Sequence, residues 1–173
     1  AAVGPRMTEV AGEVADGMIV HAFTTETYLR ETTLPSLEKG FAKAGKSRSD
    51  FEISYPVFVC TGQNEEELES SIKATAQQIA FYGSTPTYKP VLDSIGAGEL
   101  QQELNNMSKE GKWMEMGNLI GPDLIKHFAV IGEPDTIAGQ IKTRYGDLID
   151  RSCASYANIA KSDQLKIIKE LAS

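Results

Sequence analysis

The amino-acid sequence predicts an α/β fold that forms half of a (β/α)8 barrel. Strand-like and helix-like segments alternate along the chain, which is typical of a parallel sheet with helical crossovers. One strand-like segment, residues 18–21, is short and continuously apolar, as expected for a strand buried on both faces. The 173 residues supply three full strands and the end of a fourth, whereas a whole barrel needs about 250 residues.

The first elements follow from apolar spacing and from helix-breaking residues. Residues 1–3 are small and apolar and indicate the end of a buried strand whose beginning is missing, although a processed or tagged start is the alternative. A helix should begin at Pro5 and stop at Gly17. A short apolar strand should follow over residues 18–21. The side chains expected on the buried face of that first helix are Met7, Val10, Ala11, Val14 and Ala15.

The next helix is expected to begin at Thr24 or Thr25, because either hydroxyl can cap it, and Pro35 marks a break. Residues 51–60 are rich in β-branched and aromatic side chains and predict a strand, with Pro56 as an irregularity.

The rest of the chain is predicted to be mostly helical. Asn64 caps a long helix that ends at Gly83. A helical insert should then occupy residues 84 to about 130, after the penultimate strand. The remaining elements are a helix over residues 134–145, a strand over 150–156 and a helix over 162–172 with Leu165, Ile168 and Leu171 on its buried face. We therefore expect one partial-barrel domain over residues 1–173.

Composition excludes several classes of function. The net charge of -7 and the absence of a basic stripe argue against nucleic acid as a partner. No apolar run has the length of about 18 residues that a membrane span needs, and the two cysteines lie far apart. We expect a cytoplasmic protein with reduced thiols. No residues have metal-ligand spacing, so no metal site is predicted.

Five segments, in the same order along the chain, resemble the luciferase-like monooxygenases and their deazaflavin-dependent relatives. Each segment alone is a weak signal, and the order makes the resemblance specific. It implies the C-terminal half of a bacterial-luciferase-like TIM barrel. The 79–86 segment is similar to the subgroup that uses coenzyme F420. The segments are residues 1–7 with 11–17, residues 44–45 with 50–52, residues 79–86, residues 111–113 and residues 131–135.

The resemblance implies that Val3, Gly4, Arg6 and Met7 contact the phosphate or phosphodiester tail of the cofactor. Elementary physics agrees, because the first turn of a helix presents free backbone N–H groups and a positive dipole end to an anion. Gly4 lets a ligand approach the backbone closely. The alternative is a tight strand-to-helix turn that binds nothing.

His21 ends the predicted strand, on the side where barrel enzymes build their sites. It is the candidate catalytic residue, as a hydrogen-bond donor or general acid, and a structural histidine is the alternative. Four aromatic residues in or beside the insert are candidates for the substrate pocket: Phe81, Tyr82, Tyr88 and Trp113. They can instead pack the insert against the barrel.

The family resemblance implies an oxidoreductase or monooxygenase that transfers a hydride to or from a small organic substrate. The cofactor is expected to be F420, with FMN as the alternative. The other half of the site is absent, so we expect this chain alone to be inactive and to bind cofactor weakly. Two other interpretations stay open: a non-catalytic half-barrel that forms homo-oligomers, and a small α/β protein that binds a phosphorylated ligand through residues 3–7.

Overall fold

The computed structural model describes residues 2–153, 155–156 and 158–172. Ala1 of the predicted first strand and Ala154 of the predicted last strand lie outside the described residues. The described strands form two open three-stranded sheets, in the orders β1-β2-β5 and β4-β3-β6, and every pairing is parallel. The strands are β1 (Gly17–Ile19), β2 (Glu52–Tyr55), β3 (Phe58–Cys60), β4 (Ala129–Ile131), β5 (Arg151–Ser152) and β6 (Ser155–Tyr156).

The segment predicted as one strand over residues 51–60 is the centre of both sheets. It is interrupted after β2, where Pro56 cannot donate a backbone hydrogen bond, and resumes as β3. Strand β1 pairs with its first part and β4 pairs with its second part, while β5 and β6 follow one another along it. The strands therefore come from four segments of the chain, and all of them run parallel to the central segment, as in part of a barrel wall.

Strand β4 is absent from the sequence prediction. Helix α7 (Pro122–Phe128) ends directly before Ala129, with no glycine or proline between helix and strand. Three apolar residues after a helix look like its continuation, because their apolar character fits either structure. Pairing with β3 decides the conformation, and the backbone N–H of Gly132 extends that pairing by donating to the carbonyl oxygen of Cys60 at 3.1 Å.

The helices begin largely where the sequence places them. The hydroxyl of Thr25 accepts a hydrogen bond from the backbone N–H of Tyr28, and the side chain of Asn64 accepts one from Glu67. The break expected at Pro35 is a π-helical turn over Leu29–Thr33, which precedes the proline. The other helices are α1 (Pro5–Val14), α2 (Glu26–Tyr28), α3 (Leu34–Ala44), α4 (Glu65–Gly83), α5 (Lys89–Asp93), α6 (Leu100–Lys109), α8 (Pro134–Tyr145) and α9 (Lys161–Ala172).

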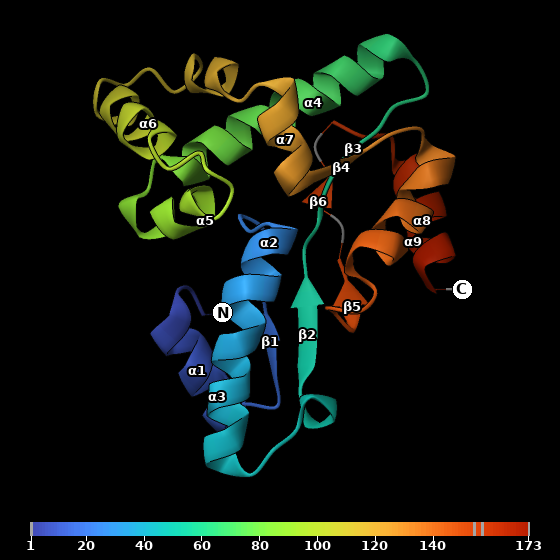
Figure 1. The fold of residues 1–173 in the computed structure, drawn as a ribbon. Helices are drawn as coiled ribbons and strands as arrows, with labels where there is room; N and C mark the ends of the chain where they lie inside the picture. The colour runs from blue at the N-terminus through green and yellow to red at the C-terminus, as the bar shows by residue number, and fades with distance from the viewer. Residues whose placement is uncertain (1, 154, 157, 173) are drawn as a thin grey trace.

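Two hydrophobic clusters hold these elements together. One joins β1 and β2 to helices α3, α8 and α9, around side chains such as Leu37, Ile53 and Tyr145. The other joins β3 and β4 to α4 and to the helices of residues 86–128. In Figure 1 the arrow of β2 points upward, and α5, α6 and α7 lie above it. These helices therefore lie toward the carboxyl ends of the strands, where barrel enzymes build their sites.

The buried face predicted for α1 is only partly correct, because Ala11 and Ala15 pack against the core but the other three predicted side chains do not. Helix α1 buries Thr8 and Gly12, whereas Met7 is 56 % exposed and Val14 is 72 % exposed. The reason is the close packing of α1 on α3, in which Gly12 lies against the backbone of Leu37. The face predicted for α9 is also only partly correct, because Leu171 packs against the core whereas Leu165 and Ile168 are exposed and Ile167 is buried.

Among the described residues, no helix combines the length and the apolar character needed to cross a membrane.

Candidate functional site

A small pocket joins the N-terminus of α1 to the carboxyl end of β1. Its volume is about 20 Å³, and Val3, Gly4, His21, Thr24 and Tyr88 are among the residues that line it. The structure thus brings together residues that the sequence analysis chose separately, for phosphate binding, for catalysis and for substrate contact. A space of this size holds about one water molecule or one oxygen atom of a ligand.

Gly4 precedes α1 with φ at 80° and ψ at 160°, a conformation that favours glycine. Its carbonyl oxygen accepts hydrogen bonds from the backbone N–H and the hydroxyl of Thr8, at 3.1 and 2.9 Å. A Cβ atom on Gly4 would meet nothing within 4 Å, so the space above this turn is open. Glycine is therefore required here by the backbone angle and leaves room for a ligand.

The first turn of α1 suits an anion. Pro5 has no N–H to satisfy, and the backbone N–H groups of Arg6 and Met7 lie in the part of a helix that has no intrahelical partner. The side chain of Arg6 is exposed and forms no ion pair with any described residue. Arg6 and Met7 do not line the small pocket but stand beside it on the surface.

His21 is held in one orientation by its neighbours. Its Nδ1 accepts a hydrogen bond from the backbone N–H of Phe23 at 3.1 Å. The ring stacks on Tyr88 and meets the edge of Tyr82, with both centroid distances at 4.8 Å. Burial lowers the pKa of His21 from its ordinary value of 6.5. At neutral pH the imidazole is therefore mostly uncharged, and because Nδ1 accepts, the proton lies on Nε2. This favours a hydrogen-bond donor at Nε2 over the general acid that the sequence also allowed.

The four aromatic candidates divide into two pairs. Tyr82 and Tyr88 contact His21, and their centroids lie 6.3 Å apart. Phe81 and Trp113 contact each other at 5.9 Å and are 51 % and 44 % exposed. Phe81 also touches Tyr82 at 5.7 Å, so the two pairs adjoin. Only the first pair reaches the imidazole.

Thr24, Tyr28 and Thr33 also line the small pocket, and no motif in the sequence predicts them as site residues. Thr24 and Thr25 were equivalent candidates for a helix cap, and the structure gives that role to Thr25. Tyr28 and Thr33 flank and end the π-helical turn, a feature that often occurs at functional sites. Nothing in the sequence marks such a turn, because it depends on how α3 packs.

No group of three or more potential metal ligands exists among the residues that the structure describes. Both cysteines are free, with Cys60 buried and Cys153 exposed. Burial raises the pKa of the Cys60 thiol to about 11, against the opposing hydrogen bonds of Thr75 and Ser71. Cys60 is thus a protonated core side chain at neutral pH.

Comparison with known proteins gives the family of this fold and site. The family model described as luciferase-like monooxygenase matches residues 1–151. An uncharacterized protein of Mycobacterium tuberculosis is 48 % identical over 151 residues, covering 87 % of this chain and 44 % of the relative. The 5,10-methylenetetrahydromethanopterin reductase of Methanopyrus kandleri is 29 % identical over 144 residues, covering 82 % of this chain and 39 % of that enzyme.

Solved structures show the same fold. The coenzyme F420 dependent tetrahydromethanopterin reductase from Methanopyrus kandleri superimposes with a TM-score of 0.73 at 22 % identity, over 96 % of this chain and 47 % of that one. An F420-dependent secondary alcohol dehydrogenase, in complex with an F420–acetone adduct, gives a TM-score of 0.68 at 19 % identity, over 98 % of this chain and 46 % of that one. The chain spans less than half the length of these relatives, and its open sheets correspond to about half of a TIM-barrel structure. The family model and the order of the elements agree: the chain belongs to the luciferase-like monooxygenase family.

Proposed function

We propose that this chain is the C-terminal half of an F420-dependent oxidoreductase that transfers a hydride to or from a small organic substrate. The observation that carries the proposal is the shared pocket, in which the Gly4 turn, His21 and Tyr88 meet. The F420-dependent relatives support the choice of cofactor. In this proposal the helices of residues 84 to about 130 are an insert over the mouth of the barrel.

The residues present fit one part of such a cofactor. The positive φ of Gly4, the open space above it and the free cation of Arg6 suit a phosphate or phosphodiester group. The pocket of about 20 Å³ is too small for a ring system. The ring would therefore need groups outside this pocket.

The cofactor, when bound, accepts or donates the hydride. The chain's own residues do the rest. Val3, Gly4, Arg6 and Met7 hold the phosphate tail, and neutral His21 donates a hydrogen bond from Nε2 to the substrate or to the cofactor. Tyr82 and Tyr88 fix the imidazole and exclude water around it. Phe81 and Trp113 extend this apolar wall and contact the substrate.

Titration of the chain with F420 and, separately, with FMN tests this assignment. We expect saturable but weak binding of F420, because the groups that surround the ring belong to the missing half, and weaker binding of FMN. Gly4→Val should weaken F420 binding further, since a β-branched side chain disfavours a φ of 80°. Tighter binding of FMN would favour a flavin monooxygenase, and tight stoichiometric binding of either cofactor would contradict the incomplete site.

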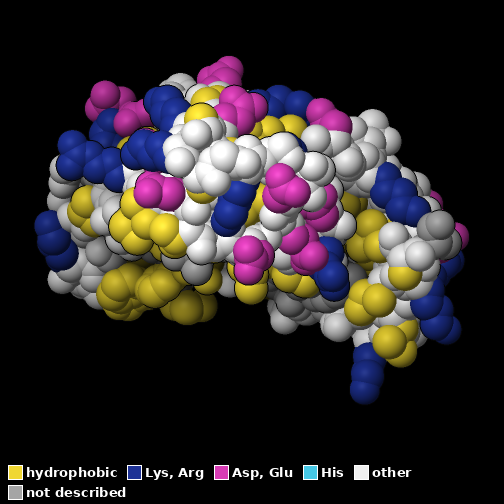
Figure 2. All heavy atoms as spheres, turned by 90° about the horizontal axis from the view of Figure 1, so that it is seen from below, with side chains coloured by type: hydrophobic (Ala, Val, Ile, Leu, Met, Phe, Trp, Pro, Cys, Tyr) yellow, Lys and Arg dark blue, Asp and Glu magenta, His cyan; other side chains and the backbone are white. Residues whose placement is uncertain are grey.

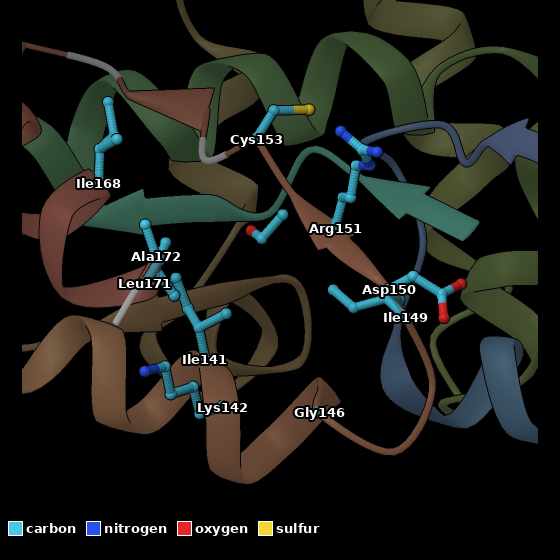
Figure 3. Close-up of a pocket in the computed structure, with 11 residues that line it drawn as sticks. Ile141, Lys142, Gly146, Ile149, Asp150, Arg151, Cys153, Ile168, Leu171 and Ala172 are labelled. Atoms are coloured by element: carbon cyan, nitrogen blue, oxygen red, sulfur yellow. The ribbon is translucent and has the colours of Figure 1, made fainter. Parts of the chain in front are cut away.

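A second candidate function is a half-barrel that self-associates without catalysis. Both sheets are open at their edges, which leaves unpaired backbone groups. Figure 2 shows hydrophobic side chains gathered in patches on one face of the molecule. A groove of about 670 Å³ lies beside β5 and is lined by Ile141, Ile168 and Leu171 among others. Figure 3 shows the side chains that line it. A second copy of the chain can cover such surfaces, and we propose a homo-oligomer in the cytoplasm.

A further inference from the structure

Arg144 of α8 holds the backbone on both sides of Phe128. Its Nη2 donates to the carbonyl oxygen of His127 at 2.6 Å, and its Nη1 donates to those of Lys126 and Ala129 at 2.9 and 3.3 Å. These three carbonyl groups lie where α7 ends and β4 begins. The guanidinium therefore satisfies carbonyl groups at a helix end, where intrahelical partners are missing, and its charge suits the negative end of the helix.

The backbone that Arg144 holds places the Phe128 ring against the candidate site. Phe128 is fully buried, and its ring stacks on Phe23 with the centroids 4.8 Å apart and the planes inclined by 27°. Phe23 is also buried, and its backbone N–H donates to Nδ1 of His21 at 3.1 Å. Because Nδ1 accepts this bond, the proton of the neutral imidazole lies on Nε2. A continuous series of contacts thus leads from Arg144 to the tautomer of His21.

The remaining contacts of Arg144 are weaker. Its Nε lies 3.5 Å from a carboxylate oxygen of Glu26, and its guanidinium carbon lies 5.1 Å from the centre of the Tyr145 ring. Glu26 also pairs with Arg30 at 2.9 Å, and both of those side chains are partly exposed, so these ion pairs contribute little. The planar fork of Arg144 is occupied mainly by backbone carbonyl groups, which suits a residue that fixes the position of a segment.

We propose that Arg144 is a positioning residue that keeps His21 in the Nε2-protonated tautomer, through the two stacked phenylalanine rings. The inference rests on the proposed function, in which Nε2 of His21 donates the hydrogen bond to the substrate or the cofactor. A hydrogen bond weakens steeply as its angle departs from linearity, so a small movement of the α7 end changes the bond from Phe23 to the imidazole. Arg144 itself does not touch the substrate or the cofactor.

NMR of the isotope-labelled ring nitrogens of His21 in the full chain tests the proposal, at a pH at which the imidazole is neutral. The shift of each nitrogen shows whether it carries the proton. Arg144→Met removes the guanidinium and keeps an unbranched side chain, whereas Arg144→Lys keeps the charge and loses the planar fork. Arg30→Met is the matched control, because Arg30 pairs with the carboxylates of Glu26 and Asp147 instead of the carbonyl groups of α7.

In the wild type the Nε2-protonated tautomer should predominate. Arg144→Met should lower the ratio of this tautomer to the Nδ1-protonated one by about fivefold, the effect of losing one hydrogen bond of about 1 kcal/mol. Arg144→Lys should lower it less, and Arg30→Met should leave it unchanged. Phe128→Leu should lower the ratio as Arg144→Met does, and combining the two should add little, because both changes interrupt the same series of contacts. An arginine with only a structural role would lower the Tm and leave the tautomer ratio unchanged.

An unchanged tautomer ratio in folded Arg144→Met would overturn the proposal, and so would a wild-type imidazole protonated mainly on Nδ1. An equal decrease in Arg30→Met would overturn it as well, because the effect would then not pass through the end of α7. If Arg144→Met does not fold, Arg144→Lys and Phe128→Leu decide by the same criterion.

The titrations with F420 and FMN separate this result from the proposed function. A tautomer ratio that depends on Arg144, without binding of either cofactor, supports the positioning role and rejects the cofactor. Binding of F420 by a chain whose tautomer ratio does not depend on Arg144 rejects the positioning role and keeps the cofactor.

Discussion

The imidazole of His21 stacks on the phenol ring of Tyr88, with the centroids 4.8 Å apart and the planes inclined by 27°. His21 follows β1, whereas Tyr88 lies 67 residues later, at the end of a 3-10 turn over Pro86–Tyr88. This contact joins the strand end to the helices beyond it. It also contributes to the burial that lowers the pKa of the imidazole.

Tyr88→Leu should raise the pKa of His21 toward its ordinary value of 6.5, because the ring that helps to bury the imidazole is gone. NMR titration of the His21 ring proton measures this. Trp113→Leu is the control, since Trp113 contacts Phe81 and not His21. A pKa of His21 that does not change in Tyr88→Leu would show that other groups bury it.

The same shift makes stability depend on pH. The pKa of His21 is lower in the folded chain than in the unfolded chain, so the unfolded chain binds more protons as the pH falls below about 6.5. The free energy of unfolding should therefore decrease from pH 7 toward pH 5 and level off below the folded pKa. His21→Gln should flatten this part of the profile, as measured by urea unfolding at each pH. A profile as steep as that of the wild type would assign the dependence to other groups.

Gly40→Ala should destabilise the chain by about 3 kcal/mol or more, by overpacking. A Cβ on Gly40 would lie 2.1 Å from the backbone oxygen of Glu9 and 2.7 Å from the nitrogen of Glu13, so α1 and α3 would have to separate. Gly139→Ala is the same substitution in the exposed part of α8, where a Cβ meets nothing within 4 Å. It should stabilise the chain by about 0.5–1 kcal/mol through helix propensity. Denaturant unfolding of both variants measures the change in the free energy of unfolding, which should be a decrease for Gly40→Ala and an increase for Gly139→Ala. Equal changes would contradict the close crossing of α1 and α3.

Cys153 should react with a thiol reagent in the native chain, and Cys60 should not. Cys153 is exposed, while Cys60 is fully buried and its pKa is raised to about 11 by that burial. Mass spectrometry after alkylation under native conditions identifies the labelled residue. Alkylation after denaturation is the control, and both thiols should then react. Rapid labelling of native Cys60 would mean that the core around β3 opens readily.

The exposed apolar side chains of α1 are a further surface that self-association should cover, besides the sheet edges and the groove beside β5. Sedimentation should show a dimer or larger assembly, and Val14→Lys should shift it toward monomer, because Val14 is 72 % exposed on a helix with Met7 and Val10 exposed beside it. Met114→Lys is the control, since Met114 is 82 % exposed but belongs to a different part of the surface. A wild-type chain that stays monomeric at high concentration would contradict this proposal.

Much of the local structure could be predicted from the sequence. The helix that follows Asn64, the glycine turn before α1 and the interruption of a strand at Pro56 all depend on the chemistry of one or two residues. The strand β4 could not be predicted, because three apolar residues after a helix have only a weak preference for strand over helix. Their pairing with a neighbouring strand decides the conformation. The exposed faces of α1 and α9 could not be predicted either, since apolar spacing shows that a face exists but not what covers it.

The features of the candidate site also fall into those that local sequence predicts and those that tertiary contacts decide. The sequence by itself determined that Gly4 would turn the chain into a helix start and that His21 would lie at the carboxyl end of a strand, although β1 ends two residues earlier, at Ile19. Both follow from the sequence because backbone angles and apolar runs are local properties. Only the tertiary structure decided that Thr24 rather than Thr25 would be left without a partner, and that Tyr88 would reach His21. Those outcomes depend on which side chains from distant segments come into contact. The spacing of residues within one segment does not determine such contacts.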